Sequence, residues 1–83
     1  AMPASFLMQQ MEWREALDDA AGLSAVEALD HQVAAEEQHM LAELERLLDQ
    51  AHDAAAAAQQ VRALMFVNRF RADIDRRLEA LDS

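Results

Sequence analysis

The stretch FLMQQMEWREALD, residues 6–18, has the spacing of a helix with two different apolar faces. At about 100° per residue, one face is formed by Phe6, Trp13, Leu17 and Ala20. The far side carries methionines and acids together, namely Met8, Met11, Glu12, Glu15 and Asp19, with Leu7 between the two faces. A helix needs only one apolar face to pack into a core. The methionines on the other face therefore predict a docking surface for a partner.

Two breaks divide the rest of the chain into further helices. Gly22 stands where a left-handed residue would end the first helix, and Ser24 followed by Glu27 fits a capping box that starts the second. The second break lies near residues 50–53, with Asp53 as N-cap. We therefore expect helices near residues 5–21, 24–51 and 54–82. The alanine run at residues 54–58 would also suit one continuous helix across the second break.

Composition and the short connections together predict the fold class. The chain of 83 residues has one Gly, one Pro and five Val or Ile, which favours helix and disfavours strand. Two short connections imply that successive helices are antiparallel neighbours. The expected fold is all-α, an antiparallel three-helix bundle that runs up, down and up, or a bent version of it.

Helical spacing also predicts which side chains form the core of the second and third helices. The second helix has a stripe at Val26, Leu29, Val33, Met40, Leu44, Leu47 and Ala51. The third has a stripe at Ala63, Val67, Phe70, Ile74, Leu78 and Leu81. Phe66 lies at the margin of that last stripe, and Met65 lies nearly opposite it.

The charge of the chain excludes several classes of partner. A net charge of −9 disfavours nucleic acid and anionic membranes. No apolar run is long enough to span a bilayer and no signal peptide is evident, so we expect a cytoplasmic protein. Residues 1–60 hold twelve acids and two Arg, net −10, whereas residues 61–83 hold four acids and five Arg, net +1. This difference favours packing of the last helix against the first two.

Residues that could carry chemistry are few. Glu36 with His39, and Asp49 with His52, have the spacing of di-iron bundles, but both pairs fall on or just past one helix. We therefore expect no metal site and no cofactor. There is no Cys and no Tyr, and the few Ser stand at caps or chain ends, so we expect no enzyme. From pattern alone, three readings of the methionine face stay open: burial within the protein, a partner-binding surface, or a structural dimerisation module.

Two segments resemble a known family. Residues 6–18 resemble FLMEQLELREELD, which opens the C-terminal domain of HscB-type co-chaperones, the J-domain proteins dedicated to iron–sulphur cluster assembly. Residues 61–71, VRALMFVNRFR, resemble VRKLRFLDKLR of the same family, and residues 78–81 fit its last turns. Between these segments, residues 22–58 resemble the family only in being helical and acidic.

The resemblance implies a partner and a set of binding residues. In that family the C-terminal domain is a three-helix bundle, here residues 5–83, that binds an IscU-like scaffold protein. Carried over by motif position, the partner-binding residues are Leu7, Met8, Met11, Glu12, Glu15, Phe66, and Asp19 in place of the usual Glu. Met11 and Trp13 each replace a Leu, the first on the binding face and the second on the core face. Five members of this set are those that helix geometry places opposite the core, and Phe66 is the residue that it places at the margin of the last stripe.

The resemblance also implies a role in a longer protein. The family's J domain carries a His-Pro-Asp motif that these 83 residues lack, since their only Pro is Pro3. We therefore do not expect the chain alone to stimulate an Hsp70 ATPase. The full protein would dock the scaffold here and present it to a dedicated, HscA-like Hsp70 through the J domain. Residues 1–4 are expected to be a cloning remnant or the end of a linker.

Overall fold

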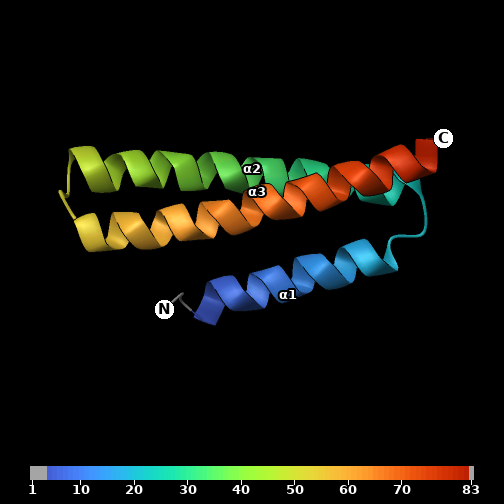
Figure 1. Ribbon diagram of the computed structural model, residues 1–83, viewed down its shortest axis with the longest axis horizontal. Coiled ribbons are helices and arrows are strands. Elements are labelled where there is room, and N and C mark those ends of the chain that lie inside the picture. The colour runs from blue at the N-terminus through green and yellow to red at the C-terminus, as the bar shows by residue number, and fades with distance from the viewer. Residues whose placement is uncertain (1–3, 83) are drawn as a thin grey trace.

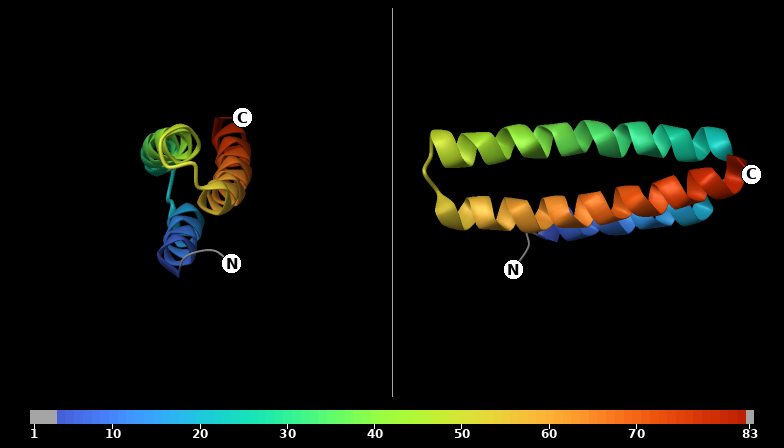
Figure 2. Two further views of the ribbon diagram at one scale, coloured as in Figure 1. Left: turned by 90° about the vertical axis from the view of Figure 1, so that its left-hand side faces the viewer. Right: turned by 45° about the horizontal axis from the view of Figure 1, so that its top comes forward.

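The chain folds into three helices, which a computed structural model describes over residues 4–82. They are α1 (Ala4–Asp19), α2 (Leu23–Asp49) and α3 (Ala54–Asp82). α2 and α3 form a long antiparallel hairpin, and α1 lies along the part of it that is remote from the α2–α3 turn (Figure 1). Figure 2 shows the same arrangement from two other directions. The predicted all-α three-helix architecture is confirmed, in a molecule of 46 × 21 × 15 Å.

The connection between α1 and α2 differs from the prediction. Gly22 has an extended backbone (φ −177°, ψ −173°) and is the N-cap of α2, whose first turn contains Ser24. The predicted left-handed cap at Gly22 and the capping box of Ser24 with Glu27 are therefore wrong. Only three residues join the two helices, and an extended residue gives such a short link more reach than a left-handed turn. The two helices accordingly end and begin at Asp19 and Leu23 rather than near residues 21 and 24.

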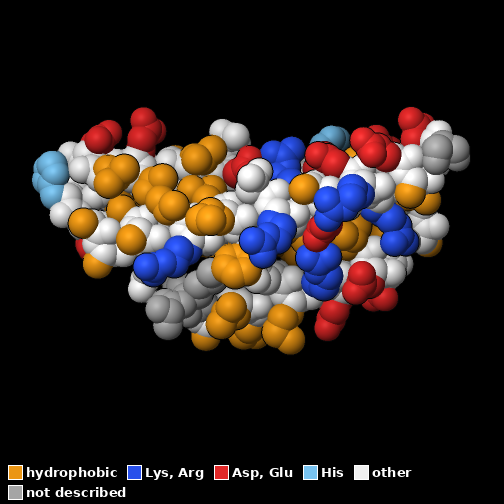
Figure 3. All heavy atoms as spheres, viewed as in Figure 1, with side chains coloured by type: hydrophobic (Ala, Val, Ile, Leu, Met, Phe, Trp, Pro, Cys, Tyr) orange, Lys and Arg blue, Asp and Glu red, His pale blue; other side chains and the backbone are white. Residues whose placement is uncertain are grey.

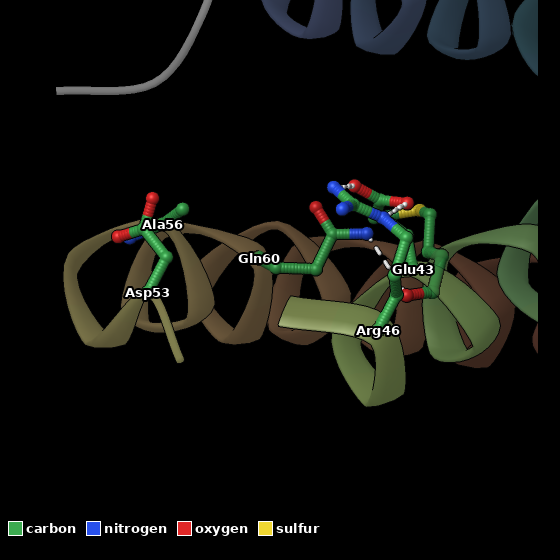
Figure 4. Close-up of polar contacts among 6 residues, drawn as sticks. Glu43, Arg46, Asp53, Ala56 and Gln60 are labelled. Atoms are coloured by element: carbon green, nitrogen blue, oxygen red, sulfur yellow. Dashed lines mark hydrogen bonds and ion pairs between the residues drawn. The ribbon is translucent and has the colours of Figure 1, made fainter. Parts of the chain in front are cut away.

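The α2–α3 connection is a true break rather than a continuous helix. His52 adopts the left-handed conformation (φ 51°), which reverses the chain after α2. Asp53 then caps α3, because its Oδ1 accepts a hydrogen bond of 3.0 Å from the N–H of Ala56. One turn further, the Gln60 side chain donates to the Met40 carbonyl at 2.9 Å and joins the two helices (Figure 4). On α2 itself Arg46 pairs with Glu43 at 2.6 Å.

The core contains the predicted stripes of all three helices. Its buried members are Trp13, Leu17, Val26, Leu29, Val33, Met40, Leu47, Ala57, Ala63, Val67, Phe70 and Ile74, with Phe6, Ala20, Leu64 and Leu78 partly buried beside them. Two predicted members, Ala51 and Leu81, are instead exposed. Ala51 follows the end of α2, and Leu81 lies in the last turn of α3, where the hairpin ends. Leu44 is half-buried.

An aromatic pair joins α1 to the hairpin. The rings of Trp13 and Phe70 stack with centroids 5.9 Å apart and an interplanar angle of 13°. The guanidinium of Arg14 lies 5.0 Å from the centroid of the Phe70 ring and pairs with Asp73 at 2.9 Å. Between α2 and α3, Arg71 pairs with Glu37 at 2.9 Å. The Arg71–Glu37 pair joins the arginine-rich last helix to an acidic one, as the charge distribution predicted, whereas the Arg14–Asp73 pair runs in the opposite sense.

Two predictions concern the ends of the chain and the possibility of a membrane span. Residues 1–3 and 83 lie outside them, so the interpretation of residues 1–4 as a linker end or cloning remnant stays a prediction, with Ala4 as the first residue of α1. Within residues 4–82, no helix combines the length and the apolar composition that a bilayer crossing requires.

Candidate protein-binding surface

The two faces of α1 differ in burial as the sequence predicted. Trp13 and Leu17 are about 5% exposed, whereas Met8 is 62% and Met11 64% exposed. Leu7, Glu12, Glu15 and Asp19 are exposed as well. Among residues 4–82 no segment buries these side chains, and hydrophobic side chains gather at the lower edge of Figure 3, on the side of α1. Large apolar side chains that are exposed together are typical of protein-binding surfaces.

α3 extends this face with a fourth large apolar side chain. Phe66 is 41% exposed and lines one groove together with Met11 and Glu15. The groove has a volume of about 490 Å³, and its wall includes Trp13 and Phe70. The stacked pair that holds α1 to the hairpin therefore also fixes the distance between Met11 and Phe66. Burial of Trp13 is in this way coupled to the shape of the exposed surface.

The remaining candidate residues are distributed around this groove. Met8 and Glu12 line a second groove of about 760 Å³, between the N-terminal half of α1 and the α2–α3 hairpin. Leu7 and Asp19 line neither groove and extend the surface along α1. Hereafter the α1 face means Leu7, Met8, Met11, Glu12, Glu15, Asp19 and Phe66.

Three side chains of the first groove were missed by the sequence analysis. Gln10, Arg14 and Arg69 line it beside Met11 and Phe66. Arg69 follows Phe66 by three residues, a spacing that places both on one side of a helix and could have indicated it. Gln10 and Arg14 line the groove because α1 packs close to α3 at this point. This approach depends on tertiary packing, so helical spacing alone could not predict it.

The acids of the α1 face carry uncompensated negative charge. Glu12, Glu15 and Asp19 form no ion pair within residues 4–82, whereas the one basic residue of α1, Arg14, is taken up by Asp73. An apolar centre with an acidic flank suits a partner segment that presents apolar and basic side chains.

The Arg14–Asp73 pair should make stability depend on pH in the acid range. The hydrogen bond from Arg14 lowers the pKa of Asp73 below its usual value near 3.8, and Arg76 adds to this shift. A lowered pKa in the folded state adds stability above the unfolded pKa, and this stability is lost as pH falls through the folded pKa. Both side chains are partly solvated, so we expect at most about 1 kcal/mol.

The Arg14→Met variant tests this expectation by urea denaturation. At pH 7 it should be less stable than the parent chain, and the difference should shrink below about pH 4 as Asp73 is protonated. A difference that is the same at pH 7 and pH 3 would show that Arg14 acts through packing on Phe70 and not through Asp73.

The three histidines are exposed and lie on or just beyond α2. Among residues 4–82, no group of three or more His, Cys, Asp or Glu side chains is placed to hold a metal ion.

Comparisons of this sequence with a family profile and with curated relatives identify the same family. A profile described as "HSCB C-terminal oligomerisation domain" matches residues 2–75. The chain is 43% identical over 86 residues to a co-chaperone protein HscB homologue of Aromatoleum aromaticum, covering 100% of the chain and 49% of that relative. It is 49% identical over 85 residues to the homologue of Burkholderia mallei, covering 99% of the chain and 48% of that relative. The chain thus spans about half the length of these curated relatives. No solved structure matches it.

Proposed function

Because the chain belongs to the HscB co-chaperone family, we propose that its α1 face binds an IscU-like scaffold protein on which iron–sulphur clusters are assembled. The observation that carries this proposal is one exposed surface on which Met8, Met11 and Phe66 meet unpaired acids. The family resemblance and helix geometry agree on Met8, Met11, Glu12, Glu15 and Asp19 by separate arguments. Scaffold binding would be a protein–protein contact and would need no catalytic group on this chain.

The composition of the α1 face suits recognition of a folded partner. Methionine is flexible and polarisable, so its side chain adapts to an irregular apolar surface. Binding energy in such interfaces is concentrated in a few well-packed central side chains, while charged side chains at the rim set association rate and specificity. In the α1 face Met11 and Phe66 are central, and Glu12, Glu15 and Asp19 form the rim.

The full-length protein would use this domain to deliver the scaffold. The proposed sequence is docking of the scaffold on the α1 face, followed by presentation to a dedicated, HscA-like Hsp70 through a J domain. A rigid three-helix domain suits such a task, because it holds the scaffold at a fixed position relative to the rest of the co-chaperone. The three helices described here would supply the docking step.

Charge reversal on the rim tests the proposal. Titration of an IscU-like scaffold into the chain by calorimetry should give saturable 1:1 binding. Glu12→Lys combined with Glu15→Lys should weaken it about tenfold or more, because like charges would then face the basic residues expected on the partner. The parent complex should weaken with added salt, whereas the variant complex should weaken less.

A matched pair of substitutions controls for net charge. Glu27 on α2 and Glu79 on α3 are exposed and lie outside the α1 face. Glu27→Lys combined with Glu79→Lys changes the charge by the same amount and should leave the affinity within about twofold. Equal losses in both variants would show that overall charge, and not the α1 face, directs binding. No binding by the parent chain would contradict the proposed function itself.

A further inference from the structure

The groove between α1 and α3 is bordered by charges of both signs. Glu15 lines it from α1 and Arg69 lines it from α3, beside the apolar side chains of Met11 and Phe66. Neither charged side chain forms an ion pair among residues 4–82. Figure 3 shows basic side chains running along the hairpin above the hydrophobic side chains of α1, with acidic side chains beside the latter. The groove is thus apolar inside, acidic toward α1 and basic toward α3.

Arg69 differs from the other arginine of this groove. The chain has sixteen acids and seven arginines. Four of the arginines pair with carboxylates of the chain, namely Arg14, Arg46, Arg71 and Arg76. Arg14 also lines the groove, but it is held by Asp73 and lies over the ring of Phe70. Of the two guanidinium groups that line the groove, that of Arg69 is the one left to a partner.

The position of Arg69 on α3 ties it to the apolar centre of the groove. Three residues separate it from Phe66, so both lie on one side of the helix. Arg62 lies on the same side, roughly 10 Å away from Arg69 along the helix axis, toward the α2–α3 turn. It is exposed as well, but it lines neither groove. A side chain bound in the groove therefore has Arg69 in its wall and Arg62 outside it.

We propose that Arg69 binds a carboxylate of the scaffold segment that occupies this groove, an inference that rests on the proposed function. The segment would place an apolar side chain between Met11 and Phe66. Its flanks would carry a basic side chain toward Glu15 and an acidic one toward Arg69. Arginine suits this task, because its planar guanidinium donates two parallel hydrogen bonds to one carboxylate.

The pair of unlike charges also determines the direction in which the segment binds. A segment that entered the groove the other way round would set a basic side chain against Arg69 and an acidic one against Glu15, and such like-charge contacts exclude wrong arrangements. The apolar contacts are the same in both directions. Arg69 is thus a specificity-determining residue, while Met11 and Phe66 contribute most of the affinity.

Calorimetric titration of an IscU-like scaffold into variants of Arg69 tests the proposal. Arg69→Glu should weaken binding about tenfold or more and Arg69→Gln about threefold, whereas Arg69→Lys keeps the charge and should cost about twofold. Arg62→Glu is the matched control, since it makes the same charge change on the same helix, and it should stay within about twofold of the parent chain. Both positions are exposed, so circular dichroism should show unchanged helix content.

A charge exchange across the groove separates local recognition from overall charge. Glu15→Arg combined with Arg69→Glu reverses the polarity of the groove and leaves the net charge at −9. Both flanks of the bound segment would then meet like charges, so the double variant should bind the scaffold more weakly than either single variant. If overall charge alone governed binding, the double variant would bind as the parent does.

A zero-length cross-link identifies the carboxylate of the partner. The chain contains no lysine, so Arg69→Lys introduces its one side-chain amine. Carbodiimide treatment of the complex should couple that amine to an Asp or Glu of the scaffold, and peptide mapping by mass spectrometry should locate the new amide bond. The amine introduced by Arg62→Lys should couple much less.

Three results would overturn the proposal while the proposed function stands: a parent chain that binds the scaffold no more tightly than Arg69→Glu, equal losses for Arg69→Glu and Arg62→Glu, or a charge exchange that leaves the affinity unchanged. Equal coupling at positions 62 and 69 would contradict it as well. A parent chain that does not bind the scaffold would instead contradict the proposed function, and this inference with it.

Discussion

Replacing Trp13 by alanine should lower the free energy of unfolding by about 3–5 kcal/mol, the usual cost of removing a large buried aromatic side chain. Trp13 is 4% exposed and stacks on Phe70 at 5.9 Å. It is the largest side chain with which α1 contacts the hairpin. Small domains are stable by roughly 5–15 kcal/mol, so this one substitution would remove a large part of the total.

Urea denaturation followed by circular dichroism measures this loss, because the variant has no tryptophan left for fluorescence. Met11→Ala is the matched control on the same helix, since Met11 is 64% exposed and should cost no more than about 0.5 kcal/mol. A Trp13→Ala variant within about 1 kcal/mol of the parent chain would mean that α1 does not depend on the stacked pair.

Replacing Met8 and Met11 together by alanine should weaken scaffold binding about 10- to 100-fold while leaving the fold intact. Each side chain is more than 60% exposed, so little packing is lost within the chain. A central interface side chain typically contributes about 1–2 kcal/mol or more, and 1.4 kcal/mol corresponds to a tenfold change in affinity. Calorimetric titration of the scaffold into the double variant measures the effect.

Met65→Ala combined with Val61→Ala provides the control for that experiment. These residues are also exposed and apolar, but they lie outside the α1 face. Their truncation should leave scaffold affinity within about twofold. If the Met8 and Met11 variant binds the scaffold as tightly as the parent chain, the α1 face is not the docking surface.

The helices and the core could be predicted because both depend on local periodicity. The burial of Trp13 and Leu17, and the exposure of Met8 and Met11, follow from spacing around one helix. The N-cap role of Asp53 follows from its residue type before an alanine run. The conformation of Gly22 could not be predicted, because it depends on the distance between the ends of two helices. That distance is a property of the packed molecule.

The groove between α1 and α3 marks a second limit of the sequence. Helical spacing placed Met11 opposite the core and Phe66 at its margin, but it could not show that both line one groove. Their proximity results from the Trp13–Phe70 stack, which sets how closely α1 approaches α3.

Methyl spectra of the chain with 13C-labelled methionine test the central claim most directly. The chain has five methionines, of which Met8 and Met11 lie on the α1 face, Met40 is buried and Met65 is exposed on α3 outside the α1 face. Adding unlabelled IscU-like scaffold should shift the Met8 and Met11 signals and leave those of Met40 and Met65 unchanged. If the Met65 signal shifts while those of Met8 and Met11 stay in place, the scaffold binds elsewhere and the account of the α1 face is wrong.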